Sequence, residues 1–484
     1  MLTQLIKVHL DCQSDVSGRA HYALSILFDA IGVPFVLSDI KDADLVYSEN
    51  KPRDMDTNAV FIQCVQKKNW DEISPLVQWE SDLPWIGELT KLGDTRGDIL
   101  YSTYAFVTGA FETQDVKDQW GVPFGKGGAL EKLGLLDQPW VLRYSEILRE
   151  KLCKAREFAT LGIPMWPDHK KYAIVLSHDV DAPISYLDTD FRKLWLKKLI
   201  REHRYIELPR AFVGFIDIAF KKFRKIVPMP KNDPNFAFEA WVEFQTKLQS
   251  KSAFYVAPIT SAGLYSDDRD VNYCFNRPEM ISAMMKVIDA GWEIGLHPSI
   301  NAWRKPERFL EEKKLLQSCL GSYEITGVRH HFWALDDYIP ERTIRLHVEA
   351  GFKYDSSLGL NDAAGFRRGV AFPFQPFDKE TSKPLEILEV PPTLMDGGVF
   401  YSDVSHQEGV EEIVTHIQNT AQHGGAVVLN WHLEQMNSSR LNGAGPALIE
   451  ALTKVSSDSE IFWASPSEMY QWWAKRRELI KASG

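Results

Sequence analysis

The sequence holds two aspartates one residue apart, Asp179 and Asp181, directly after the apolar run 172–177. In an extended chain residues i and i+2 face the same side, so both carboxylates can enter one site. Histidines end two other apolar runs, at His297 and His432. Divalent metals such as zinc bind carboxylate and imidazole groups, and a bound metal lowers the pKa of water to roughly 7. We therefore predict a hydrolytic metal site, in which one carboxylate accepts a proton and a histidine donates one.

Each of these residues also has a purely structural interpretation. Aspartate is common in turns, so the Asp179–Asp181 pair could cap a loop. His297 and His432 could be core histidines bonded to backbone groups. A functional site is favoured because six polar residues fall at or near the ends of predicted strands, where barrel enzymes hold their catalytic groups. The six are Asp179, Asp181, His297, Arg329, Asp355 and His432.

The elements that must position these residues lie between residues 170 and 484. Short apolar runs predict strands at 172–177, 253–257, 292–297, 327–332, 352–355, 385–390 and 426–432. Helical patterns between them, at 278–290, 306–320 and 340–350, each begin with Pro-Glu and are each followed by glycine, as helix starts and stops often are. Buried strands that alternate with helices predict a parallel sheet covered on both faces, and closing such a sheet gives an α/β barrel.

Residues 1–165 predict a separate, smaller α/β domain, whose role the sequence does not indicate. Strand patterns lie at 33–37, 44–47 and 60–62, and helical patterns at 22–31, 98–111 and 141–159. The segment 162–168 contains two prolines and a glycine and is the best candidate for a linker. The glycine-rich run 124–129 lacks the spacing of a phosphate-binding loop, and we interpret it as a plain loop.

Four motifs in the larger region resemble those of the polysaccharide deacetylases of the NodB-homology type (carbohydrate esterase family four). They are Ser177-His-Asp-Val-Asp181, Glu293-Ile-Gly-Leu-His-Pro-Ser299, Gly327-Val-Arg329 and Leu429-Asn-Trp-His432. Residues 365–369, 372–374 and 389–392 also resemble segments of bacterial relatives that carry an extra N-terminal α/β domain. The likeness spans about residues 170–475. It implies a distorted (β/α)7 barrel preceded by a smaller α/β domain.

The resemblance also implies a role for each matching residue. Asp179 would be the catalytic base, Arg329 would orient it, and His432 would be the general acid. Asp181 and His297 would bind the metal. We further expect three residues in or beside these segments to contact substrate: Asp355, Trp431 and Arg367.

The sequence departs from the family pattern at Asn301, where the second motif usually ends in a second metal-binding histidine. Asparagine offers a neutral oxygen, which is a poorer zinc ligand than imidazole. Three outcomes stay open. Asn301 or water completes a weaker site, His330 or His331 takes the missing place, or the metal is lost.

The resulting prediction is a metal-dependent hydrolase, with zinc as the expected divalent metal, that removes an N-acetyl group from a carbohydrate. The alternative is a non-catalytic carbohydrate-binding or scaffold protein on a degenerate deacetylase barrel, which Asn301 favours. A third hypothesis is hydrolysis of another amide or C–N bond, such as that of a cyclic ureide, on the same group of residues.

The net charge of −11 argues against a nucleic-acid partner, which calls for a basic surface. The segment at about 190–228, between the first two predicted strands of the barrel, is expected to leave the barrel as a helical excursion. Its residues 192–224 are rich in Lys and Arg, with apolar residues between them. Such a segment can bind weakly to an anionic membrane surface, although a solvated helical excursion is the plainer interpretation, which we prefer. We find no secretory signal and no long apolar stretch, and the five cysteines are scattered. These features predict a cytoplasmic protein; the oligomeric state stays open.

Overall fold

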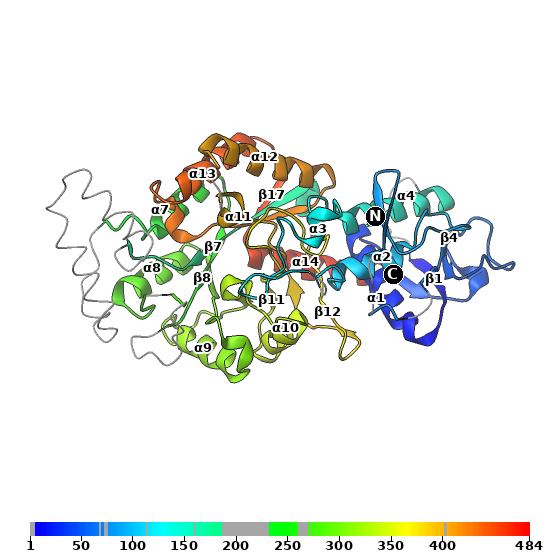
Figure 1. Ribbon diagram of the computed structural model, residues 1–484, viewed down its shortest axis with the longest axis horizontal. Helices are drawn as coiled ribbons and strands as arrows, with labels where there is room; N and C mark the ends of the chain where they lie inside the picture. Colours follow the sequence, from blue (N-terminus) through cyan, green and yellow to red (C-terminus); the bar gives the residue numbers. More distant parts are fainter. Residues whose placement is uncertain are drawn as a thin grey trace.

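In the part of the chain that it describes, the computed structural model of this elongated molecule contains two larger sheets, which lie apart from each other (Figure 1), and two two-stranded ones. Both chain termini lie at the end with the smaller sheet. None of the helices among the residues that the structure describes is long and apolar enough to cross a bilayer. The described residues are 5–66, 69–71, 76–112, 115–158, 161–185, 232–259, 270–271, 273–400 and 404–484. The basic excursion predicted at about 190–228 lies outside them.

The smaller sheet is parallel, has the order β2-β1-β3-β4, and forms what we call the N-terminal unit together with its helices. Its predicted α/β class is confirmed, with β2 (Phe35–Leu37), β3 (Leu45–Ser48) and β4 (Val60–Gln63) at the predicted places. The first strand, β1 (Ile6–Asp11), was not predicted. The main helices are α1 (Ser14–Ile31), α2 (Ile99–Val107) and α4 (Trp140–Arg156), joined by the short α3 (Ala129–Lys132) and the hairpin β5–β6 (Val77–Glu80, Leu83–Ile86).

The larger sheet has nine strands, in the order β14-β11-β10-β9-β8-β7-β16-β15 with β17 also paired to β7. Every one of its strand pairs is parallel. The strands are β7 (Tyr172–Val180), β8 (Ser252–Val256), β9 (Glu293–Leu296), β10 (Gly327–Val328), β11 (Tyr354–Asp355), β14 (Leu388–Glu389), β15 (Leu394–Met395), β16 (Ala426–Asn430) and β17 (Ile461–Ala464).

The larger sheet is strongly curled. Its end strands, β14 and β15, are also neighbours in the sequence, because only residues 390–393 separate them. Five extended residue steps span at most about 18 Å, so the two ends of the sheet must lie close together. The predicted barrel is thus confirmed as a curled parallel α/β sheet. Two of its strands, β15 and β17, were not predicted.

Helices follow most of these strands, as predicted for an α/β sheet. They are α7 (Phe238–Lys247), α8 (Pro278–Asp289), α9 (Glu307–Gln317), α10 (Pro340–Glu349), α11 (Asp396–Phe400), α12 (His406–Gln422), α13 (Ala444–Val455) and α14 (Pro466–Ala482). The predicted proline starts of α8 and α10 are confirmed, and Gly291, Gly321 and Gly351 all have left-handed φ angles just beyond α8, α9 and α10. In that conformation glycine avoids the strain that a Cβ would add.

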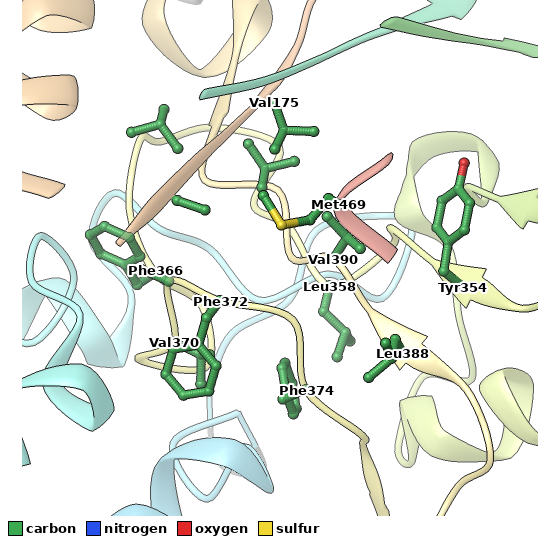
Figure 2. Close-up of a cluster of buried hydrophobic side chains, with 14 of the residues drawn as sticks. Val175, Tyr354, Leu358, Phe366, Val370, Phe372, Phe374, Leu388, Val390 and Met469 are labelled. Atoms are coloured by element: carbon green, nitrogen blue, oxygen red, sulfur yellow. The ribbon is translucent and has the colours of Figure 1, made fainter. Parts of the chain in front are cut away.

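The inner face of the larger sheet packs against loops and α14 (Figure 2). Val175 of β7, Tyr354 of β11 and Leu388 of β14 share one buried cluster with Met469 of α14. Phe366 and its neighbours up to Phe374 add aromatic rings to this core. Burial of large apolar side chains stabilises the sheet by roughly 1.5–3 kcal/mol each, which holds the polar carboxyl edge in place.

The N-terminal unit is packed directly against the larger sheet. Two backbone hydrogen bonds join the units: the amide of Phe366 donates to the carbonyl of Leu136 at 2.8 Å, and the amide of Val141 donates to the carbonyl of Gly369 at 2.9 Å. The hydrophobic core is continuous across the two units. The segment 162–168, predicted as a linker, lies between the two larger sheets in the sequence. The two units nevertheless share one hydrophobic core.

Candidate active site

The candidate site lies at the carboxyl edge of the larger sheet, as predicted. Asp179 lies near the end of β7, and Asp181 is the first residue after that strand. His297 directly follows β9, Arg329 directly follows β10, and His432 lies just beyond β16. Because all these strands are parallel, their carboxyl ends meet at one edge and the five side chains converge there.

Three residues form a group that could hold a metal ion: Asp181, His297 and His331. One ligand atom from each lies within 4.8 Å of the others. Nε2 of His297 is 3.3 Å from Oδ1 of Asp181, and Nε2 of His331 is 3.4 Å from Oδ2. Both imidazole rings are almost completely buried. One carboxylate and two imidazoles are a ligand set that suits zinc and related divalent metals.

Unsatisfied polar atoms support this assignment. Among the described residues, neither Nε2 of His297 nor Oδ1 of Asp181 has a hydrogen-bond partner, although both atoms are buried. Nδ1 of His297 faces the carbonyl of Arg329 at 2.6 Å, so this nitrogen carries the proton and donates it. Nε2 is then left with a lone pair directed at Asp181, which is how a metal-binding histidine is normally held. The residues therefore fit a divalent metal.

His331 is held by a second carboxylate. Its Nδ1 lies 3.3 Å from Oδ1 of Asp270, which also accepts a 2.8 Å hydrogen bond from the amide of Ile300. Although burial opposes protonation, the pKa of His331 rises to about 9 because Asp181 and Asp270 face its ring. The pKa of the Asp181 carboxyl falls well below its usual value despite burial, since His331 and His297 face it. Asp270 gave no signal in the sequence.

The position that Asn301 leaves open has a candidate occupant in His331. Of the two alternative histidines, His331 faces Asp181, whereas the ring of His330 stacks 6.2 Å from that of His347. Asn301 lies just before the short helix η6 (Ala302–Arg304). Whether its side chain adds a further ligand stays a prediction.

Asp179 is buried and held in the ionised form by two donors. Nη1 of Arg329 donates to Oδ1 at 3.2 Å, and Nδ2 of Asn430 donates to Oδ2 at 2.7 Å. Burial alone would raise the pKa of the Asp179 carboxyl, but the positive charge of Arg329 outweighs it and lowers the pKa. Arg329 is itself fixed by Ser177 and Ser356, to which it donates at 2.7 and 2.8 Å. Arg329 thus lies against Asp179, the residue that we expect it to orient.

His432 lies on the other side of Asp181, with Nε2 3.4 Å from Oδ2 of that residue. Its Nδ1 faces Asp396 at 2.9 Å, and its backbone amide donates to the same carboxylate at 2.7 Å. Burial disfavours the imidazolium, but the charge of Asp396 raises the pKa of His432 well above its usual value. The side chains of Asp181 and His432 are 20% and 19% exposed, so the site reaches solvent at this point.

Sequence reasoning missed Asp396. It is the first residue after the two-residue strand β15, which was not among the predicted strands.

The three residues that we expect to contact substrate are all buried, and whether they contact it stays a prediction. Asp355 is fully buried and pairs with Nδ1 of His347 at 2.7 Å. Trp431 is also fully buried, and its indole N–H donates to the carbonyl of Ala444 at 3.0 Å.

Arg367, the third of them, forms a two-fold hydrogen-bonded pair with Glu112 of the N-terminal unit, at 3.0 and 2.9 Å. Position in a motif could not reveal this, because burial depends on the packing of distant segments.

No family model matches the sequence, and no curated protein matches it. Weak similarity to solved structures is found. A putative polysaccharide deacetylase from Mycobacterium smegmatis is 16% identical with a TM-score of 0.42, over 64% of this chain and 93% of that one. An allantoinase is 14% identical with a TM-score of 0.39, over 66% and 95% of the two chains. A polysaccharide deacetylase from Bacillus cereus is 11% identical with a TM-score of 0.29, over 47% and 85%.

Proposed function

We propose that this protein is a metal-dependent hydrolase that removes an N-acetyl group from a carbohydrate. The observation that carries the proposal is the pair of unsatisfied, buried atoms on His297 and Asp181, which face each other beside His331. An unpaired buried polar atom costs about 1–3 kcal/mol. These two atoms make no hydrogen bond and face each other at 3.3 Å, an arrangement that a bound metal ion would satisfy.

The residues that would hold the metal are Asp181, His297 and His331. A divalent metal at this point would supply Lewis acidity, which makes water a nucleophile at neutral pH. The remaining site residues supply proton transfer. Both carboxylate oxygens of Asp179 keep a lone pair beyond those used by Arg329 and Asn430, so ionised Asp179 can accept the proton of the attacking water.

His432 can complete the reaction as the acid. Asp396 favours its protonated form, and its Nε2 points toward Asp181 at the solvent-exposed part of the site. Protonation of the departing amine nitrogen by this imidazolium would release the free amine. An ionised base and a protonated acid on two sides of one metal position are what amide hydrolysis requires.

The carbohydrate substrate class is an inference from the motifs. Residues 177–181, 293–299, 327–329 and 429–432 resemble those of polysaccharide deacetylases. The site geometry is equally compatible with other amides. The experiment must therefore measure the metal and the substrate separately.

The first test uses the full-length protein. We expect about one equivalent of zinc after reconstitution, and acetate release from N-acetylglucosamine oligomers that stops on chelation. Asp179→Asn should lower kcat by roughly 10²- to 10⁴-fold, because it removes a general base, and should keep the metal. His297→Ala should lose the metal itself.

A matched control is Asp289→Asn, which changes an exposed carboxylate at the end of α8 and should retain wild-type activity. Full activity in metal-free protein, or in Asp179→Asn, would refute the hydrolytic mechanism.

The alternative of a non-catalytic carbohydrate-binding scaffold makes the opposite prediction for the metal. Its support is Asn301, which weakens the second motif, and it requires that reconstituted protein bind no zinc. The position of His331 beside Asp181 counts against it.

A further inference from the structure

One loop of the N-terminal unit reaches the carboxyl edge of the larger sheet. We call this loop, residues 117–126, the docking loop; in Figure 1 it runs in cyan toward α3 and α11. The amides of Gly125 and Lys126 donate to Asp362 at 2.8 and 3.1 Å, just beyond β11. Nζ of Lys126 donates to the carbonyl of Gly398 in α11 at 3.2 Å. The docking loop is thus tied to the segment that begins with Asp396.

The docking loop is also tied to the segment that carries His331. Nζ of Lys117 donates to the carbonyl of Asp337, which lies six residues beyond His331. Nδ2 of Asn361 joins the two segments, because it donates to Oδ2 of Asp118 at 2.8 Å and to the carbonyl of Phe332 at 3.1 Å. The N-terminal unit therefore contacts the chain next to a candidate metal ligand.

The backbone after His331 is strained. Phe332 and Trp333 have φ angles of 55° and 51°. Bulky residues rarely adopt this left-handed conformation, and it persists only where the surrounding structure holds it. His331 is the adjacent residue in the same short helix η7 (His331–Trp333), so the direction of its ring depends on whatever holds this turn.

A stack of three rings holds the turn from the side of the docking loop. The rings of Trp120 and Phe332 are 4.2 Å apart and nearly parallel, at 8°. The ring of Phe332 lies 4.1 Å from that of His331, at 20°. Asp118 fixes Trp120 in turn, since its Oδ1 accepts the backbone amide of Trp120 at 2.8 Å. On the opposite side, Asp270 faces Nδ1 of His331.

We propose that Trp120 is a positioning residue for the metal ligand His331, and that the N-terminal unit thereby completes the metal site of the larger sheet. This inference rests on the proposed function, because it requires that a metal bind at His331. Without Trp120, the ring of Phe332 loses its outer support and the strained turn can relax. The Nε2 atom of His331 then turns away from Asp181 and metal affinity falls.

The test measures zinc affinity directly, by competition with a chromophoric chelator, in the full-length protein. Groups that orient metal ligands typically change affinity by about 10- to 100-fold. Trp120→Ala should therefore bind zinc at least about tenfold more weakly than the wild type. Trp120→Phe keeps an aromatic ring to stack on Phe332 and should stay within about threefold of the wild type. The matched control is Trp79→Ala, which removes a half-exposed tryptophan that packs on Trp140 of the same unit.

The outcomes separate the two proposals. If the wild type binds no zinc, the proposed function fails and the positioning role fails with it. If the wild type binds zinc and folded Trp120→Ala binds it equally tightly, only the positioning role is wrong. If Trp120→Ala does not fold, the zinc affinity of Asn361→Ala tests the positioning role instead. This variant removes the side-chain link between Asp118 and the Phe332 carbonyl. Its zinc affinity should also fall, and an unchanged affinity would overturn the role.

Discussion

Two imidazoles at the candidate site are held in the same way. His432 and His331 each direct Nε2 toward Asp181, at 3.4 Å, and each present Nδ1 to a second carboxylate, Asp396 and Asp270 respectively. This arrangement fixes the orientation of each ring. The two rings differ in depth, because His432 is half-buried at the solvent-exposed part of the site, whereas His331 is almost fully buried. Only His432 is therefore placed to protonate a leaving group.

At the residue scale, the decisive comparison is between His331 and Asn301 as the third metal ligand. We expect His331→Ala to weaken zinc binding by more than about tenfold, because it removes an imidazole whose Nε2 faces Asp181. Asn301→Ala should change the affinity by less than about threefold, since a neutral amide oxygen is a poor zinc ligand. Competition with a chelator measures both. An equal loss of zinc affinity in the two variants would show that Asn301 contributes as much to metal binding as His331.

At the element scale, α12 buries a histidine that the proposed reaction does not use. His416 lies on the inner face of this helix, and its ring stacks on that of Phe366 at 5.3 Å. Burial lowers the pKa of His416 to about 4. In the unfolded chain the pKa returns to about 6.5. The folded state therefore binds this proton less readily, and its stability falls as the pH drops from about 6.5 towards 4.

His416→Phe should remove this part of the pH dependence. We compare the free energy of unfolding of the variant with that of the wild type at pH 7.5 and at pH 4.5. The difference, variant minus wild type, should be about 2 to 3 kcal/mol larger at pH 4.5 than at pH 7.5. Urea unfolding of both proteins at the two pH values measures the change, and comparison with the wild type cancels the other titrating groups. The same difference between the two proteins at both pH values would contradict the prediction.

At the scale of the whole molecule, buried polar groups join the N-terminal unit to the larger sheet. Glu112 pairs with Arg367 at 2.9 Å and with Arg368 at 2.7 Å, and all three side chains are almost fully buried. Arg476 of α14 makes a second connection, since it donates to the carbonyls of Ala30 and Pro164 at 3.3 and 2.8 Å. Such contacts hold the N-terminal unit, and with it the docking loop, against the larger sheet.

Glu112→Gln should destabilise the protein by about 3–5 kcal/mol, because it leaves the buried guanidinium group of Arg367 without its carboxylate partner, whereas Arg368 keeps Glu341. Thermal unfolding measures the loss. The matched control is Glu150→Gln, an exposed position on α4, which should stay within about 0.5 kcal/mol of the wild type. Equal stability of the two variants would mean that the buried pairs contribute nothing to the packing of the units.

The sequence by itself was sufficient for features that depend on local patterns. Short apolar runs predicted most strands of the larger sheet, and proline and glycine marked the helix limits, because both signals come from residues close together in the chain. Position at the strand ends also predicted that Asp179, Asp181, His297, Arg329 and His432 would meet. Parallel strands make that meeting a consequence of topology.

Tertiary structure decided the features that depend on distant segments. His330 and His331 are adjacent and identical in type, and only the turn of η7 determines that His331 faces Asp181. Asp270 and Asp396 became partners of the site histidines through contacts that no periodicity records. Arg367, which we expect to contact substrate, pairs with Glu112, 255 residues away in the sequence. A sequence pattern reports the faces of one element, whereas the partner of a buried charge is determined by which elements the fold brings together.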